Sequence, residues 1–544
     1  MYVIDPRMYI TAVPNRNSPP AILLRESFRD GDQVRTRTLA NLTSWAPERI
    51  DARRRALKGE FDGFTGEPQP VCGSIFAVLF ALKQLAERIG LLQVLGSERW
   101  AKLVLFLILA RGAAQGSRLS AVRWATQHAG AETLGLKPFD EDDLYEALDR
   151  LAEAQEDMED ALYRRTVRQR GGTPTVVLYD VTSSYLEGEH NALAAFGYSR
   201  DQKPGKAQIV IGLLTTAAGE PVAVHVYEGN TADPGTVPEP VHTLRTRFGI
   251  TELVFVGDRG MVKAKGKHAL TTAGFRYITA LTTPQVRRLL QTQVLRPEWF
   301  TTHVQEVVHG AVRLLLRRSE ALRQQAARRR ADKWAKLQRL ITARNTFVSA
   351  AKRAKPDTGL RTLQAWVKQH KLEAFVQVAL HDGLLLATLD PAAQAEATVL
   401  DGCYVLETDV PPATLDAQAV HDRYRDLQEV ERDFRTMKTG LLEVRPIFVR
   451  KALRTRAHVL VTMLALKVVR EMRRALVAAF GTTADNKMAV TVEEALLALA
   501  RLCLLTYHVQ GTAVTRLPTP DARQQAILDA LGTPLPPPRR LRQM

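Results

Sequence analysis

The sequence predicts an α/β protein in which a mixed β-sheet is flanked by helices. Three observations carry this prediction. Between residues 171 and 281, short apolar runs of strand composition alternate with segments of helical periodicity. Two of these runs end on an acid, at Asp180 and at Asp258. A long polar helix is predicted from Tyr424 to Lys438, and Glu431 lies at its centre.

The composition favours a folded chain that meets nucleic acid. For 544 residues about two to four domains are expected, and 45% hydrophobic residues are enough for real cores. The net charge of +17 indicates a polyanionic partner. The apolar stretches are too short to span a membrane and no secretory signal pattern is visible, so we predict a cytoplasmic protein that binds DNA or RNA and no membrane. Cys72, Cys403 and Cys503 are too widely spaced to predict a zinc site, and we interpret them as thiols in a reducing compartment.

The first 170 residues predict two regions. Residues 1–60 contain strand candidates at 8–14 and 21–28 and should form a small β-rich region. Residues 61–170 change to helical periodicity, with an apolar stripe that starts at Ile75. This helical region is expected to bind DNA or to mediate dimerisation, and no motif decides between the two.

Residues 171–281 predict the first part of the core. Strands are expected at 175–180, 207–215, 221–228, 252–258 and 275–281, and helices at 234–248 and 263–273. Three strands in a meander, followed by two right-handed crossovers, make the first and fourth strands neighbours. Asp180 and Asp258 should therefore meet at the carboxyl edge of the sheet. This is the ribonuclease-H-like arrangement.

An insertion is predicted to interrupt the core at residues 282–420. From Ala311 to Lys355 the chain has 14 Lys or Arg residues and two acids, with apolar residues interleaved. This pattern indicates a long basic helix or helix pair that binds DNA, and Arg328, Arg329 and Arg330 are its candidate contacts. Later apolar runs predict strands, so the insertion should have helices and a sheet of its own.

The chain after the insertion predicts the rest of the core and a C-terminal region. Residues 421–476 should complete the core, and residues 477–544 should follow as a separate C-terminal part. Amphipathic helices are expected at 456–476 and 492–508. The end, from Pro534, is rich in proline and arginine and is expected to be disordered.

The three acids predict a metal-dependent site for phosphoryl transfer. Clustered carboxylates repel each other unless a cation joins them. Two Mg²⁺ ions about 3.5–4 Å apart, held by Asp180, Asp258 and Glu431, would clamp the attacking and leaving oxygens of a phosphodiester. Oxygen ligands favour Mg²⁺, with Mn²⁺ as a substitute, over zinc. Asp180, the deepest in the sheet, is expected to bridge both ions.

Other residues of the predicted helix are candidate DNA contacts. Tyr424, Glu431 and Lys438 are seven residues apart and so form one stripe. Tyr424 can donate a hydrogen bond to a phosphate oxygen, and Arg435 and Lys438 can neutralise phosphate charge. Each of these residues alone is more often an ordinary surface group, whereas the joint pattern with two strand-end aspartates favours catalysis.

Four segments resemble the DDE transposases of bacterial insertion sequences. They are Tyr179-Asp180-Val-Thr-Ser-Ser-Tyr, Gly229-Asn-Thr-Ala-Asp-Pro, Val256-Gly-Asp258-Arg-Gly-Met and Tyr424 with Val430-Glu431-Arg-Asp-Phe-Arg-Thr-Met-Lys438. The resemblance runs over roughly residues 170–470 and is to the branch that has a Tyr-Arg-Glu-Lys signature and an insertion before the glutamate. It implies an enzyme, acting as a homodimer or larger assembly, that nicks double-stranded DNA at terminal inverted repeats and joins it to target DNA. The resemblance implies Asp180, Asp258 and Glu431 as the catalytic residues.

The chain departs from this signature at two positions. Leu427 occupies the place of the signature's Arg, so the phosphate interaction of that Arg is absent or passes to Arg425 or Arg435. Val449 occupies a place where close relatives are expected to have His. Neither change affects the acids.

Two alternatives remain open. A ribonuclease-H-like nuclease would cut without joining, and a domesticated DNA-binding protein would keep the basic surface without catalysis. The intact acids argue against the second alternative, because a binding role would not need clustered acids beside DNA. His225 and His421 are isolated in the sequence and are expected to be structural.

Overall fold

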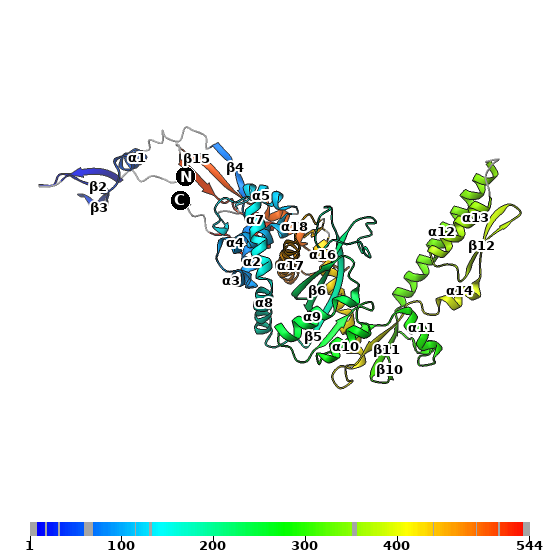
Figure 1. The fold of residues 1–544 in the computed structure, drawn as a ribbon. Helices are drawn as coiled ribbons and strands as arrows, with labels where there is room; N and C mark the ends of the chain where they lie inside the picture. Colours follow the sequence, from blue (N-terminus) through cyan, green and yellow to red (C-terminus); the bar gives the residue numbers. More distant parts are fainter. Residues whose placement is uncertain are drawn as a thin grey trace. The chain divides into compact units, whose positions relative to one another are not determined.

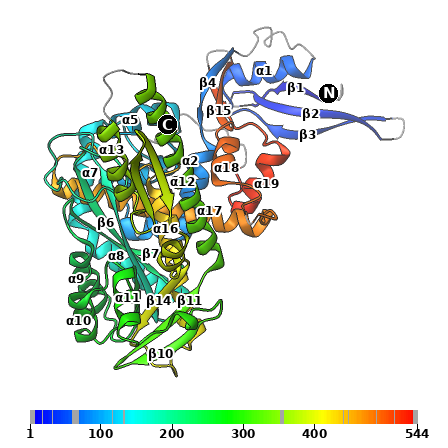
Figure 2. The same ribbon diagram turned by 90° about the vertical axis from the view of Figure 1, so that its right-hand side faces the viewer.

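The structure is a computed structural model. It divides the chain into two compact units, one of residues 1–73, 504–518 and 536–544 and the other of residues 74–503 and 519–535. Figures 1 and 2 show the elements of these units. The described residues are 8–16, 19–30, 33–58, 69–114, 116–129, 133–350, 356–438, 440–445, 447–485, 487–509 and 512–536.

The larger unit is built on an eight-stranded mixed sheet with the order β10-β11-β14-β9-β8-β5-β6-β7. Its central strand β5 (Val176–Tyr185) pairs antiparallel with β6 (Gln208–Thr216) and parallel with β8 (Val254–Gly257). Strand β7 (Pro221–Glu228) is antiparallel to β6, and β9 (Arg276–Ala280) is parallel to β8. The order β7-β6-β5-β8-β9 is the predicted one, and the ribonuclease-H-like arrangement is confirmed.

One predicted strand end is wrong. Strand β5 does not end at Asp180 but continues to Tyr185, because β6 pairs with it as far as the pair Tyr185 and Gln208. The parallel neighbour β8 stops earlier, at the pair Tyr179 and Gly257. Asp180 therefore lies one residue beyond the parallel pairing, within a strand whose other edge stays paired.

Alternate side chains of β5 enter two different cores. Val177, Tyr179 and Val181 pack with residues of the helices that follow β7. Val176 and Leu178 pack in the larger core on the other face. Because side chains alternate along a strand, Asp180 has the parity of Leu178. The helices on the first face are α9 (Pro238–His242), the π-helix η2 (Thr243–Arg247) and α10 (Ala264–Thr272).

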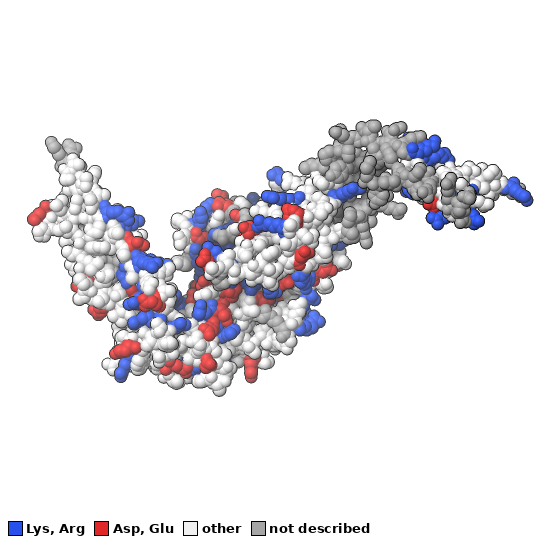
Figure 3. Space-filling model, turned by 180° about the vertical axis from the view of Figure 1, so that it is seen from behind, with Lys and Arg blue, Asp and Glu red and all other residues white. Residues whose placement is uncertain are grey.

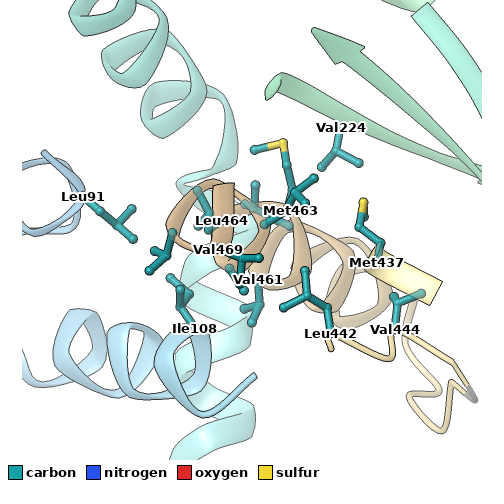
Figure 4. Close-up of a cluster of buried hydrophobic side chains, with 14 of the residues drawn as sticks. Leu91, Ile108, Val224, Met437, Leu442, Val444, Val461, Met463, Leu464 and Val469 are labelled. Carbon is teal, nitrogen blue, oxygen red and sulfur yellow. The ribbon is translucent and has the colours of Figure 1, made fainter. Parts of the chain in front are cut away.

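Helix α17 (Ala452–Phe480) occupies the middle of the larger core. It is longer than the predicted helix at 456–476, and most of its residues from Ala457 to Val469 are buried. It contacts α4 (Arg99–Ala113) and α7 (Glu141–Glu153) as well as β7. Figure 4 shows its side chains between Leu91 and Ile108 of the helical region and Val224 of the sheet. The helical region is thereby joined to the sheet through this buried helix, and also through α8 (Gln155–Arg170), which contacts β7 directly.

Further helices cover this core. They are α2 (Ala77–Arg88), α3 (Leu91–Leu95), α5 (Arg118–Gln127), α8 (Gln155–Arg170), α18 (Val492–Leu499) and α19 (Ala522–Leu531).

The predicted helix at 492–508 is wrong in its second half. The helix ends at Leu499 and the chain becomes a strand at Cys503, because Leu505–Val509 pair with a hairpin partner.

The insertion contributes strands to the central sheet, which the sequence did not predict. Strand β14 pairs with β9, β11 with β14, and β10 with β11. The basic stretch from Ala311 begins as strand β11 and becomes helical at Glu320, while residues 351–355 lie outside the described residues. The elements are α11 (Thr283–Gln291), β10 (Gln305–His309), β11 (Val312–Arg318), α12 (Glu320–Ala350), α13 (Pro356–Gln369), β12 (Val376–His381), β13 (Leu384–Leu389), α14 (Pro391–Thr398) and β14 (Cys403–Thr408).

Part of the insertion does form a layer of its own. Strands β12 and β13 pair as a separate hairpin. Leu337 and Ile341 of α12 are buried with Leu363 and Val367 of α13 and with apolar residues of the hairpin. The apolar residues interleaved with the basic ones in α12 thus face this small core, and the charged side chains lie on the rest of the helix surface.

The smaller unit contains two three-stranded sheets. The strand candidates at 8–14 and 21–28 are strands, and the basic stretch that follows them is a third strand. Leu24, Leu42 and Ile50 form the small core under helix α1. The elements are β1 (Met8–Val13), β2 (Ala21–Asp30), β3 (Gln33–Asn41), α1 (Pro47–Leu57), β4 (Gln69–Ile75), β15 (Cys503–Val509) and β16 (Thr512–Arg516).

Two further expectations concern the whole chain. None of the helices in the described part of the chain combines the length and the apolar character that a bilayer crossing needs. The predicted Pro- and Arg-rich tail lies outside the described residues from position 537 on.

Candidate active site

The two aspartates are brought together by strand register. Tyr179 on β5 is paired with Gly257 on β8, in parallel. The next residue on each strand is an aspartate, so Asp180 and Asp258 follow side by side at the same edge of the sheet. Both have the parity of side chains that pack in the larger core. The two carboxylates therefore lie on the sheet face that this core covers.

Glu431 reaches the same place from helix α16 (Leu427–Lys438), which packs on β5. Leu427, Val430, Phe434 and Met437 follow a three-four-three spacing and are buried, so they fix the face that the helix turns to the sheet. Glu431 lies beside this apolar stripe and is exposed. The apolar pattern of the helix thus sets where its carboxylate projects.

The predicted helix from Tyr424 to Lys438 is two helices. Helix α15 (Ala417–Arg425) ends before Asp426, and the amide of Glu429 donates to the carbonyl of Asp426, three residues back, at 2.9 Å. This tight turn starts a new hydrogen-bond ladder in α16. Tyr424 belongs to the first helix, and its hydroxyl donates to Oδ1 of Asp258 at 3.1 Å. Tyr424 therefore orients a carboxylate.

The three acids line one cleft of about 460 Å³. Phe434 and Met261 form part of its apolar wall. The polar residues that line it are Asp180, Thr182, Tyr198, Arg200, Asp233, Asp258, Glu431, Arg435 and Lys438.

The three carboxylates of this cleft repel one another. The pKa of Asp180 is raised to about 7, mainly by burial and also by the negative charges of Asp258 and Glu431. A backbone hydrogen bond from Val181 and the charge of Arg200 act in the opposite direction. Burial likewise raises the pKa of Tyr424, with the charge of Asp258 as the next cause. A cation among the three carboxylates would relieve this repulsion.

The donors fit a hard divalent cation. The three acids offer oxygen ligands only, as Mg²⁺ and Mn²⁺ prefer. In the described part of the chain no three acid, His or Cys side chains are already gathered closely enough to hold a metal. Asp258 and Glu431 are exposed, so changes of rotamer can bring their carboxylates towards half-buried Asp180.

Lys438 lies in the cleft wall with a protein partner. Its ammonium donates to Asp201 at 2.8 Å, and the guanidinium of Arg445 meets the same carboxylate at 2.5 Å. Burial lowers the pKa of Lys438, and the interaction with Asp201 acts in the opposite direction. Lys438 is therefore a fixed charge at the cleft.

Of the other predicted DNA contacts, one lines the cleft and three do not. Arg435 is exposed and lines it. Arg328, Arg329 and Arg330 lie on α12 of the insertion, where Arg328 and Arg329 are exposed and Arg330 forms an ion pair with Asp401 of the insertion. In Figure 3, Lys and Arg side chains gather along one edge of the insertion.

The sequence predictions missed four polar residues that line the cleft, of which Thr182 belongs to β5. Tyr198 and Arg200 come from the loop between β5 and β6, and Asp233 comes from the turn after β7. Arg200 pairs with Asp233 at 2.5 Å. The segment Gly229-Asn-Thr-Ala-Asp233-Pro was a usable signal for Asp233, whereas Tyr198 and Arg200 have no periodic pattern around them.

Other singled-out residues lie in the interior. His225 is buried beside Glu239, with Nδ1 3.2 Å from a carboxylate oxygen, and His421 is buried among Tyr404, Arg317 and Asp422. Leu427 and Val449, the two departures from the signature, are also buried. Leu427 therefore serves the core and supplies no phosphate contact.

Comparisons with known proteins identify the family of the chain. A family described as the transposase DDE domain matches residues 171–466, and a family described as the N-terminal domain of IS1634 family transposases matches residues 10–71. No curated protein matches the chain. Among solved structures, a piggyBac transposase synaptic complex with hairpin DNA matches with 9% identity and a TM-score of 0.33, over 80% of this chain and 82% of that chain. The first family match spans the strand and helix residues that form the cleft.

Proposed function

This chain belongs to the DDE transposases of the IS1634 family, and on that premise we propose that Asp180, Asp258 and Glu431 are its catalytic metal ligands. A DDE transposase is a DNA-binding enzyme that works with a divalent metal ion. The observation that supports the assignment is the register of Tyr179 with Gly257, which sets the two aspartates side by side where α16 presents Glu431.

The chemistry is phosphodiester cleavage followed by strand transfer. Two bound Mg²⁺ ions, or Mn²⁺ in their place, would acidify the attacking hydroxyl and stabilise the charge on the scissile phosphate. Asp180, the most enclosed of the three acids, would be a ligand shared by the two ions, and Asp258 and Glu431 would each add a ligand to one of them. The hydroxyl of Tyr424 fixes the orientation of Asp258.

The cations of the cleft act on the DNA strand. Arg435 is exposed at the wall beside Glu431 and neutralises a phosphate next to the scissile one. Lys438 supplies a second positive charge about 10.5 Å along the helix, two turns from Glu431. Together they hold the backbone so that one phosphodiester lies over the acids.

The substrate is the pair of transposon ends. We infer that the enzyme recognises terminal inverted repeats, cuts there, and joins the freed ends to target DNA as a homodimer that holds two ends. Exposed Arg328 and Arg329 of α12 add phosphate contacts outside the cleft. These contacts position the duplex and carry no sequence information.

Strand transfer is the decisive test. The purified protein is incubated with Mg²⁺, a plasmid target and a duplex of the terminal repeat whose transferred strand already ends in a 3′-hydroxyl. We expect covalent joining of the end to the plasmid, which is lost in EDTA. Nicking of intact ends without any joining would instead identify a nuclease of the same fold, and binding without either reaction would identify a non-catalytic DNA-binding protein.

A further inference from the structure

Tyr198 is a large aromatic residue that the fold leaves in solvent. Its side chain is 82% exposed, yet it lines the same cleft as Asp180, Asp258 and Glu431. Scattered exposed apolar residues are ordinary on protein surfaces. An aromatic ring at the wall of a phosphodiester-cleaving cleft is a different case, because the substrate there carries flat aromatic bases.

The loop that carries Tyr198 is held in place by hydrogen bonds from buried side chains. Gln208, which is 2% exposed, donates through its side-chain amide to the carbonyl of Tyr198 at 3.1 Å and to that of Gly229 at 2.9 Å. The amide of Arg200 donates to Oγ of buried Ser183 at 3.0 Å. These bonds fix the backbone at Tyr198 and at Arg200, so the exposure of Tyr198 does not result from a loose loop.

The loop also packs closely on the turn that follows β7. A side chain in place of Gly197 would put its Cβ 2.2 Å from the carbonyl oxygen of Gly229, which no structure tolerates without movement. The residue before Tyr198 must therefore be glycine for the loop to lie where it does. The ring is presented by a segment whose position is determined by sequence.

A cation accompanies the ring. The guanidinium carbon of Arg200 lies 5.8 Å from the centroid of the Tyr198 ring, within cation–π range. Arg200 is in turn held by Asp233 at 2.5 Å. The ion pair therefore holds a guanidinium beside the ring and limits the movement of the ring. An exposed aromatic side chain in such a fixed position is a platform on which the bases of single-stranded nucleic acid stack.

We propose that Tyr198 forms a stacking subsite for an unpaired nucleobase of the DNA strand at the cleavage site. This subsite rests on the proposed function, since the cleft must hold DNA for the ring to meet a base. Stacking is tolerant of sequence because every base has a π-face. Tyr198 therefore favours an opened duplex end over a closed one without selecting a particular base.

The test is a binding measurement in EDTA, so that no cleavage occurs. The probes are a blunt duplex and the same duplex with a short single-stranded overhang that carries a fluorescent purine analogue, whose emission falls when it stacks. We expect the wild-type protein to quench the analogue and to prefer the overhang probe. Tyr198→Ala should abolish the quenching and weaken binding of the overhang probe about 5- to 150-fold, the range seen when a base-stacking aromatic is removed, while blunt-duplex affinity is unchanged.

Two variants control for other roles of the loop. Tyr198→Phe keeps the ring and should behave as the wild type, and Phe196→Ala removes a 72% exposed ring of the same loop and should also quench normally. Quenching by Tyr198→Ala equal to wild type, or its loss in Tyr198→Phe, would overturn the stacking subsite. Absence of Mg²⁺-dependent cleavage by the wild-type protein would overturn the proposed function and leave the quenching result intact.

Discussion

Asp201 joins two cations beside the cleft, although its own side chain is only 2% exposed. It accepts from Lys438 at 2.8 Å and from Arg445 at 2.5 Å, and the amide of Tyr185 donates to its second oxygen at 3.2 Å. The three charged groups together carry one net positive charge. Lys438 is therefore held at the cleft as a positioned charge, and its position depends on a loop residue that no helical pattern predicts.

Loss of Lys438 should misplace the strand without loosening the complex. We expect Lys438→Ala to fold, to bind end DNA with near wild-type affinity, and to cleave about 10²-fold more slowly, because small misplacements of a reacting group have effects of that size. Lys438→Arg should recover part of the rate, since the charge is kept in a different geometry. The measurement is single-turnover cleavage of an end duplex at saturating protein.

Lys451 provides the matched control. It is exposed at the N-terminus of α17, beyond the stripe, and Lys451→Ala should cleave at the wild-type rate. If Lys438→Ala cleaves as fast as Lys451→Ala, Lys438 is an ordinary surface charge, and of these helix residues only Glu431 would have a role in cleavage.

At the scale of elements, α17 carries a buried ion pair into the core. Lys467, whose side chain is 4% exposed, pairs with Glu220 in the turn between β6 and β7. Burial alone would raise the pKa of Glu220, but the charge and hydrogen bond of Lys467, with the charges of Arg470 and Arg474, outweigh it and lower the pKa. This pair ties the helix to the sheet that carries Asp180.

Glu220→Gln should destabilise the protein by about 3–5 kcal/mol at neutral pH, because it leaves the ammonium of Lys467 buried without its partner. A carboxyl whose pKa is lowered by folding contributes stability above its unfolded pKa, about 4.3 for Glu, and loses it as pH falls through the lower folded value. The difference in free energy of unfolding between wild type and variant should therefore become smaller below about pH 4. Denaturant unfolding at several pH values measures this difference. The control is Glu187→Gln, which should change the free energy of unfolding little because Glu187 forms an exposed ion pair with Lys206.

The exposed arginines of helix α12 should affect how DNA affinity depends on salt concentration. Replacing Arg328 and Arg329 by Ala should weaken binding to all duplexes alike and should flatten the slope of log K against log salt by about 0.9 for each phosphate that the protein no longer neutralises. Arg330→Ala is the comparison, since Arg330 is engaged with Asp401 and should leave the slope unchanged. An unaltered slope in the double variant would show that these arginines do not meet phosphates.

Element boundaries were less predictable from the sequence than element order. The alternation of strands and helices at 171–281 gave the correct order because each apolar run is short and bounded by turn residues. The run at 503–509 was assigned to a helix because period alone does not separate short strands from helices, and only pairing with β16 decides it. Strands β11 and β14 joined the central sheet through long-range pairing, which no local pattern encodes, and β10 follows as the hairpin partner of β11.

At the scale of the whole molecule, the site is an intersection of three distant stretches. Asp180 and Asp258 are fixed by one parallel register, and Glu431 arrives after the insertion on a helix that packs on the same strand. The sequence predicted this convergence because the three acids belong to the topology itself. It did not predict Tyr198 and Arg200, because an irregular loop places them through side-chain hydrogen bonds such as those of Gln208.

The most direct measurement of the central claim is Mg²⁺-dependent cleavage of an end duplex by Asp180→Asn, Asp258→Asn and Glu431→Gln, with binding measured in parallel. Each change removes a metal ligand and one negative charge, so end-DNA affinity should stay near wild type or rise slightly. We expect all three variants to bind and none to cleave. Substantial Mg²⁺-dependent cleavage by any one of them would contradict the assignment of the three carboxylates to one catalytic centre.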